Sequence, residues 1–114
     1  MATREIDKQY WQGVLEQLST QLAAQRVEIE ADSLDLGAQI EAEWVQLRGI
    51  DYDPIEETVT IDTADGPHRI EDPERLLIAD QGPEILALEL IGGDGTQRIL
   101  RFRSPLMLTG PAKV

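Results

Sequence analysis

The sequence predicts an α+β fold in which one N-terminal helix packs on a curved antiparallel sheet of six or seven strands. Three observations lead to this class. A helical repeat of apolar residues occurs only near the N-terminus, within residues 8–24. From residue 26 onward, apolar and polar residues alternate as they do in half-buried strands. Turn-forming residues then recur about every ten positions, which is typical of a meander.

The expected helix begins after Asp7, a residue type that caps helix N-termini well. With Asp7 as the cap, Ile6 and Trp11 have the spacing of a hydrophobic staple. The apolar residues that share one helical face are Trp11, Val14, Leu15, Leu18 and Leu22. We therefore expect a helix over residues 8–24. A helix with a single apolar stripe is not stable alone, so this one packs on the strands that follow.

The first two expected strands differ in regularity. Residues 26–31 alternate without interruption. Residues 39–47 alternate up to Trp44 and then change phase, with Val45 and Leu47 continuing the pattern. A change of phase inside a strand indicates a β-bulge or a sharp bend. We therefore expect a strongly curved sheet, either open or closed into part of a barrel.

The remaining strands are short and separated by clear turn signals. They are expected at residues 58–62, 68–71, 76–79, 85–91 and 98–103. The glycine-rich segment 92–95 between the last two strands predicts a tight hairpin. One α+β domain over residues 1–104 accounts for this pattern, and residues 105–114 are expected to form a C-terminal tail.

Charge is the strongest feature of the composition. The 114 residues include 22 acids and 10 bases, which gives a net charge of −12 and a pI near 4.3. A surface of this sign repels nucleic acid backbones and anionic membranes, so neither is expected as a partner. No apolar run is long enough to cross a bilayer, and the polar start of the chain lacks a signal-peptide core, so we expect a cytoplasmic protein.

Catalytic motifs are not found in the sequence. The chain has no cysteine, which excludes thiolate nucleophiles and disulfides, and His68 is its one histidine. Ser19, Ser33 and Ser104 lie outside the G-x-S-x-G context of serine hydrolases. We therefore assign no catalytic residue and expect a protein that is not an enzyme.

Metal and phosphate sites receive little support. Asp51, Asp53, Glu56 and Glu57 offer oxygen ligands of the kind that Ca²⁺ or Mg²⁺ prefers, but the EF-hand pattern of oxygen residues and glycine is not present. The glycines of segment 92–95 are not followed by the Lys-Ser/Thr of a phosphate loop. We therefore assign no metal ligand and no cofactor.

Several sequence segments together are similar to a known family. They are residues 3–6 (TREI), 37–54 (GAQIEAEWVQLRGIDYDP), 58–62 (TVTID) and 94–105 (DGTQRILRFRSP). The chain resembles, over residues 3–105, a family of short bacterial proteins of unknown function (DUF5335-like). The resemblance implies a small single-domain α+β protein. It implies no reaction, ligand or catalytic residue.

Acidic residues gather on the predicted strands. Glu28 and Glu30 should share one face of their strand, and so should Glu41 and Glu43. Like charges on neighbouring strands repel each other. The cations expected to offset this repulsion are Arg98, Arg101 and Arg103. Alternation places Arg101 and Arg103 on one face of the last strand and Arg98 on the other.

The candidate binding residues are Trp44, Arg101 and Arg103. Trp44 lies at the phase change, where one of two large side chains must be exposed, and Leu106–Leu108 make the tail apolar. We expect a non-enzymatic protein-interaction module, with a protein partner or a second copy of the chain. The alternative is a small-ligand or divalent-metal-binding protein that uses a pocket in the curved sheet.

Overall fold

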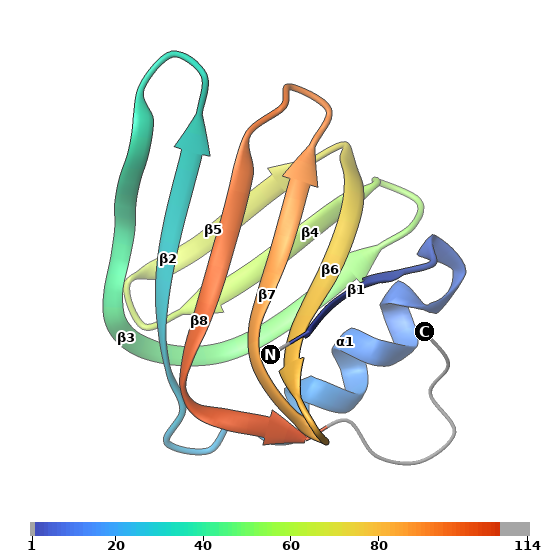
Figure 1. Ribbon diagram of the computed structural model, residues 1–114, viewed down its shortest axis with the longest axis vertical. Helices are drawn as coiled ribbons and strands as arrows, with labels where there is room; N and C mark the ends of the chain where they lie inside the picture. Colours follow the sequence, from blue (N-terminus) through green and yellow to red (C-terminus); the bar gives the residue numbers. More distant parts are fainter. Residues whose placement is uncertain (1, 108–114) are drawn as a thin grey trace.

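Eight antiparallel strands and one short helix make up residues 2–107, the part of the chain that the computed structural model describes (Figure 1). The helical elements are the 3₁₀ turn η1 (Lys8–Tyr10) and helix α1 (Trp11–Ser19). The strands are β1 (Ala2–Ile6), β2 (Arg26–Ser33), β3 (Gly37–Asp53), β4 (Thr58–Thr63), β5 (Gly66–Glu71), β6 (Pro73–Gln81), β7 (Glu84–Gly92) and β8 (Gln97–Met107). The α+β class is therefore confirmed. The expected number of strands is wrong, because β1 adds an eighth to the seven predicted segments.

The eight strands form one open sheet that folds over itself. Its order is β1-β6-β7-β8-β2-β3-β4-β5, so β1 and β5 are its two edges. Of the two forms considered from the sequence, the curved sheet is therefore open and not a partly closed barrel. Strand β3 is 17 residues long and belongs to both halves: residues 37–46 pair with β2, and residues 47–53 pair with β4. In Figure 1, β3 descends beside β2 and then turns to pass behind the strands of the first layer toward β4. The first layer holds β1, β6, β7, β8, β2 and the start of β3; the second layer holds the rest of β3 with β4 and β5.

The bend of β3 follows from irregular pairing along the strand. Between the pairs Val27–Val45 and Ile29–Ala42, β3 contains one residue more than β2. Trp44 lies in this bulge and has a φ of 50°, in the left-handed region that non-glycine residues rarely adopt. A bulge bends and twists its strand. The phase change predicted at Trp44 and Val45 is therefore confirmed as the start of the turn from one layer to the other.

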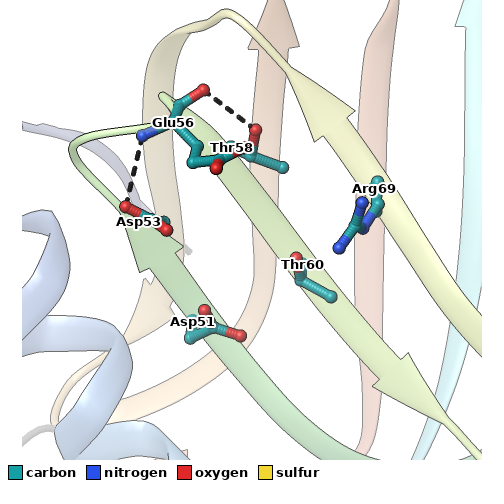
Figure 2. A pocket seen from close by; sticks show the side chains of 6 residues that line it. All are labelled: Asp51, Asp53, Glu56, Thr58, Thr60 and Arg69. Carbon is teal, nitrogen blue, oxygen red and sulfur yellow. Dashed lines mark hydrogen bonds between the residues drawn. The ribbon is translucent and has the colours of Figure 1, made fainter.

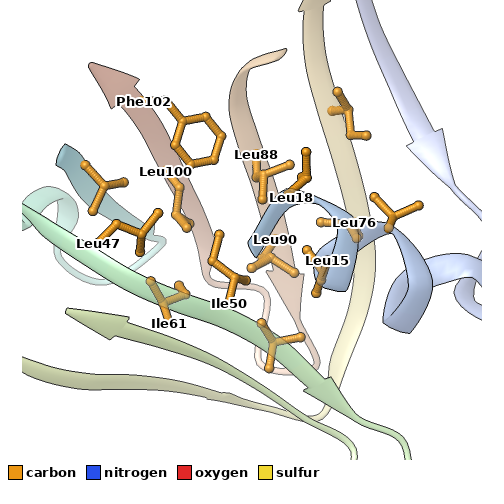
Figure 3. Close-up of a cluster of buried hydrophobic side chains, with 14 of the residues drawn as sticks. Leu15, Leu18, Leu47, Ile50, Ile61, Leu76, Leu88, Leu90, Leu100 and Phe102 are labelled. Atoms are coloured by element: carbon orange, nitrogen blue, oxygen red, sulfur yellow. The ribbon is translucent and has the colours of Figure 1, made fainter. Parts of the chain in front are cut away.

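The hydrophobic core fills the space between the two layers. Figure 3 shows side chains of the first layer pointing toward those of the second, with α1 beside them. Its labelled members are Leu15, Leu18, Leu47, Ile50, Ile61, Leu76, Leu88, Leu90, Leu100 and Phe102, all of them buried. Since these side chains come from both layers and from the helix, the layers and α1 depend on one another for burial.

The helix is shorter than the sequence pattern predicts. Asp7 caps η1 as expected by accepting a hydrogen bond from the Gln9 backbone N–H. The helix ends at Ser19 rather than near residue 24, because the Thr20 hydroxyl donates to the Gln17 carbonyl, and Ala24 has a positive φ of 59°. Side-chain bonding to a helical carbonyl and a left-handed residue both compete with continued helix.

Helix α1 and the segment after it cover the free side of the second half of β3. The Ser19 hydroxyl donates to the Ile50 carbonyl at 2.7 Å and accepts from the Ile50 N–H at 3.2 Å. The Leu47 N–H donates to the Gln25 carbonyl at 2.9 Å. Unpaired backbone groups on a strand edge invite pairing with other chains. These contacts occupy that edge from within the chain.

Two glutamine side chains hold the end of β8. The Gln25 amide, itself buried, donates to the Ser104 carbonyl at 2.8 Å and accepts from the Ser104 N–H at 3.1 Å. Gln21 binds the N–H and carbonyl of Met107 in the same manner. Residues 105–107 of the expected tail therefore belong to β8, and residues 108–114 lie outside the described part of the chain.

Strand β1 was not predicted, and two ion pairs fix it to the sheet. Arg4 contacts the Asp80 carboxylate at 2.7 Å, and Glu5 contacts Arg75 at 2.8 Å. Both pairs join β1 to β6, the strand beside it. Among residues 2–107, no helix combines the length and the apolar character that a membrane span requires.

Candidate functional site

Each layer carries a depression on its outer face, and the two differ in chemistry. The polar depression of the second layer is lined by Asp51, Asp53, Glu56, Thr58, Thr60 and Arg69. The apolar depression of the first layer is lined by Trp44, Ala79, Leu86, Ala87, Glu89, Ile99, Arg101 and Phe102. These two surfaces are the candidates for a binding site.

The polar depression is formed by side chains that lie in a row across three strands. Asp51 of β3 pairs with Thr60 of β4, which pairs in turn with Arg69 of β5, and Figure 2 shows these side chains across the depression. Asp53 accepts from the backbone N–H groups of Ile55 and Glu56, at 2.9 and 3.2 Å. Its carboxylate therefore stabilises the turn that leads into β4.

The polar depression does not gather a set of metal ligands. Glu57, the fourth acid of the metal pattern considered in the sequence, pairs with Lys8 at 3.2 Å and is not among the lining residues. Within residues 2–107, no three acidic or histidine side chains come together as metal ligands would. The Arg69 guanidinium at the rim adds a cation that disfavours a bound metal ion.

The apolar depression owes its shape to small residues on adjacent strands. Ala79 of β6 lies opposite Ala87 of β7, and Ala87 lies opposite Arg101 of β8. Two alanines side by side leave a hollow that larger neighbours surround, here Leu86 and Ile99, both half-buried. The hollow has a volume of about 430 Å³.

Trp44 reaches this hollow because of the bulge in β3. Its backbone geometry departs from regular alternation, and Arg26 donates to its carbonyl oxygen at 3.0 Å. Its side chain lines the depression together with residues from β6, β7 and β8, and the residue is 36% exposed. The second tryptophan of the chain, Trp11, is 1% exposed and donates its indole N–H to the Ile6 carbonyl. Trp44 is thus the tryptophan available for contact with another molecule.

Arg101 lies at the rim of the apolar depression between two carboxylates. Its guanidinium contacts Glu30 at 2.9 Å and Glu28 at 3.1 Å. The hydrogen bond to Glu30 is the largest influence on the pKa of Arg101 and raises it, and the contact with Glu28 acts in the same direction. Arg101 therefore stays charged and neutralises part of the acidic strand β2, as the sequence predicted.

The Glu41 carboxylate connects the two layers. Arg98 of β8 contacts Glu41 of β3 at 3.4 Å, and the same carboxylate lies 3.7 Å from Nδ1 of His68 on β5. Arg98 and Arg101 thus point to different neighbours, as alternation along β8 predicts. His68, the one histidine of the sequence, therefore faces the Glu41 carboxylate of the first layer.

Two of the three predicted binding residues meet in the apolar depression. Trp44 and Arg101 both line it, whereas Arg103 is exposed and does not. The lining residues missed in the sequence are Ala79, Leu86, Ala87, Glu89, Ile99 and Phe102. The alanines within otherwise apolar strands were the available signal, because a small residue on an exposed face leaves room beside larger neighbours.

The fold and its surface define a small α+β protein built on a bent antiparallel sheet, with an acidic surface and an outward-facing apolar hollow. The chain belongs to a family of unknown function (DUF5335), whose model matches residues 2–111. A protein of Aquifex aeolicus (strain VF5), described as an uncharacterized protein, is 32% identical over 111 residues, which cover 95% of this chain and 98% of the relative. No solved structure matches the chain. The family resemblance stated from the sequence is therefore confirmed.

Proposed function

We propose that this protein is a non-enzymatic interaction module that docks a protein partner on its apolar depression. The observation that carries the proposal is the exposed Trp44 beside half-buried Leu86 and Ile99, around a hollow floored by alanines. Aromatic and aliphatic side chains around a hollow are typical anchor points of protein interfaces. Removing apolar surface from water there favours association by about 25 cal/mol for each square ångström, and the entropy lost on binding offsets part of this gain.

The engagement of the polar side chains supports a role in binding rather than catalysis. Ser19 is bonded to the backbone of Ile50, and Ser33 accepts from the Leu36 N–H at 3.1 Å. His68 faces Glu41, and no serine bond to it occurs within residues 2–107. A nucleophile paired with a base is the arrangement that hydrolytic chemistry requires. The described side chains are instead used to connect strands.

A ligand or metal site in the polar depression is less well supported. Asp53 is occupied by backbone N–H groups, and Arg69 adds a positive charge beside the acids. The side chains around the depression are hydrophilic and open to water, whereas small-molecule sites are mostly apolar and enclosed. We therefore place the binding function on the first layer.

Site-specific photo-crosslinking in bacterial cytoplasm, the compartment expected from the sequence, tests this proposal. A photoreactive phenylalanine analogue replaces Trp44 in one variant and Arg69 in the control, which lies on the outer face of the second layer. We expect discrete crosslinked products from position 44 and none from position 69. Products of equal yield from both positions, or none from position 44 in a folded variant, would contradict the proposal.

A further inference from the structure

We infer that the segment docked in the apolar depression is basic and apolar, with lysine or arginine beside its apolar residues, and belongs to another protein. This inference rests on the proposed function and adds the chemistry of the partner. The juxtaposition behind it is an apolar hollow with three carboxylates, Glu28, Glu30 and Glu89, around Arg101, the cation among the lining residues. The charge of the rim selects the partner, and the hollow supplies the contact area.

The carboxylates around the depression are only partly neutralised. Glu28 and Glu30 share the single guanidinium of Arg101, so this group of three keeps a net negative charge. Glu89 also lines the depression, and the ion pairs formed among residues 2–107 leave it without a cation. Interfaces match positive with negative potential, so cations on the partner fit this rim.

The same outer face continues toward the hairpin between β2 and β3. Glu30 lies opposite Ile99 on one side and opposite Ile40 on the other, so these three side chains form one row across the sheet. Ile40 is exposed, as are Leu34 and Leu36 at the tip of the hairpin, where Leu34 is fully exposed. Exposed apolar side chains therefore also occur beyond the hollow, at Ile40 and at the tip of this hairpin.

The exposed tip is held by local hydrogen bonds. The Leu36 N–H donates to the Ser33 hydroxyl at 3.1 Å, and the Gln39 side chain donates to the Leu36 carbonyl at 3.2 Å. A turn ordered in advance loses less conformational entropy on binding. The tip therefore adds contact area at one end of the docking face, and Asp32 and Asp35 place further negative charge beside it.

A second copy of this chain fits the face poorly. Two copies joined through the same face would bring Glu28, Glu30 and Glu89 of one copy toward the same carboxylates of the other. The whole chain carries a net charge of −12, so long-range repulsion acts in the same direction. A basic partner removes both sources of repulsion.

Trp44 provides a direct readout of occupancy. The chain contains two tryptophans, and the buried Trp11 is shielded from a neutral quencher such as acrylamide. Quenching of tryptophan fluorescence therefore reports the exposure of Trp44. The probes are a short peptide of alternating lysine and leucine and a matched peptide with glutamate in place of lysine, added to the full chain. The Trp44→Phe variant should show no change in quenching with either peptide.

We expect the lysine peptide to protect Trp44 and the glutamate peptide to leave it accessible. The affinity for the lysine peptide should fall as NaCl is raised from ~50 mM to ~500 mM, because salt screens charge attraction. Equal protection by the two peptides, or no protection by either, would overturn the inference.

Two pairs of matched variants separate docking on this face from general attraction to an acidic protein. Glu89→Gln and Asp62→Asn each remove one negative charge, but Asp62 lies on β4 in the other layer. Ile99→Ser and Ile55→Ser each remove one isoleucine, and Ile55 is 93% exposed in the turn before β4. We expect binding to weaken about 3-fold for Glu89→Gln and about 10-fold for Ile99→Ser, with both controls unchanged. Equal losses within each pair would overturn the inference.

The crosslinking experiment keeps this inference distinct from the proposed function. A product from position 44 that contains a basic partner supports both. A product that contains an acidic protein or a second copy leaves the proposed function standing and overturns the inference. The absence of any product from position 44 overturns the proposed function, whatever the peptides do.

Discussion

Replacing Gln25 by alanine should destabilise the fold, although this residue lies in the loop between α1 and β2. The side-chain amide of Gln25 is 5% exposed and forms two hydrogen bonds with the backbone of Ser104, on a strand 79 residues away. Its oxygen also accepts from the Arg26 N–H at 3.2 Å. The substitution therefore removes a contact that joins the segment between α1 and β2 to the end of β8.

The size of the effect follows from these bonds. A net intramolecular hydrogen bond contributes about 1 kcal/mol, and a buried group left without a partner costs about 1–3 kcal/mol. Two bonds to the backbone of Ser104 give an expected loss of about 2–3 kcal/mol for Gln25→Ala. Gln21 makes the equivalent contact with Met107 at an exposed position. Water replaces that contact easily, so Gln21→Ala should cost less than about 1 kcal/mol.

Urea unfolding followed by circular dichroism measures both losses. The two variants remove the same chemical group from positions four residues apart, so Gln21→Ala serves as the matched control. Equal slopes with urea concentration would show that the change lies in stability and not in the compactness of either state. A loss for Gln25→Ala no larger than that for Gln21→Ala would refute the reasoning.

Three further predictions concern the core, the net charge and one carboxylate. Trp11→Phe should cost about 2 kcal/mol in urea unfolding, because the buried Ile6 carbonyl loses its indole donor; a loss below about 0.5 kcal/mol would contradict this. Stability in urea should rise as NaCl goes from ~10 mM to ~1 M, since salt screens the self-repulsion of an acidic chain; a rise of the same size near pH 4.3, the pI, would point to another cause. The backbone hydrogen bond from Thr96 lowers the pKa of Asp94. This stabilisation is present above the unfolded pKa near 3.8 and is lost as pH falls through the lower folded pKa. Asp94→Asn should therefore flatten the curve of urea-unfolding stability against pH below pH ~4, and an unchanged curve would contradict this.

Local sequence patterns predicted most of the fold. The hairpin at residues 92–95 forms as expected, with the Gly92 N–H donating to the Thr96 carbonyl and Gly95 at a φ of 84°. The bend at Trp44 was also visible, because a bulge shifts the alternation of apolar residues along one strand. Both features depend on residues close together in the chain. Such features leave a signal in periodicity and in turn residues.

Features that depend on distant residues were not predicted. Strand β1 covers Ala2–Ile6, in which only Ile6 is buried, so no alternation marks it. Its position comes from pairing with β6 and from ion pairs with Arg75 and Asp80. The end of α1 was placed too late because Leu22 continues the apolar repeat while the backbone at Ala24 has already left the helix.

The candidate site was predicted in part for the same reason. Trp44 was found from its local phase change, and Arg101 from the alternation that places it with Arg103 on one face of the last strand. Ala79 and Ala87 lie on different strands, and only their register makes them adjacent. The hollow is a property of that register, which no single stretch of sequence contains.

The 17-residue strand β3 also constrains how the molecule can unfold. Its first half is hydrogen-bonded into one layer and its second half into the other. Unfolding of either layer therefore removes the hydrogen-bonding partners of half of this strand. Within residues 2–107 the two layers are thus expected to unfold together, in a single cooperative transition. Because Trp44 lies at the bend of β3, the proposed partner would bind next to the segment that connects the two layers.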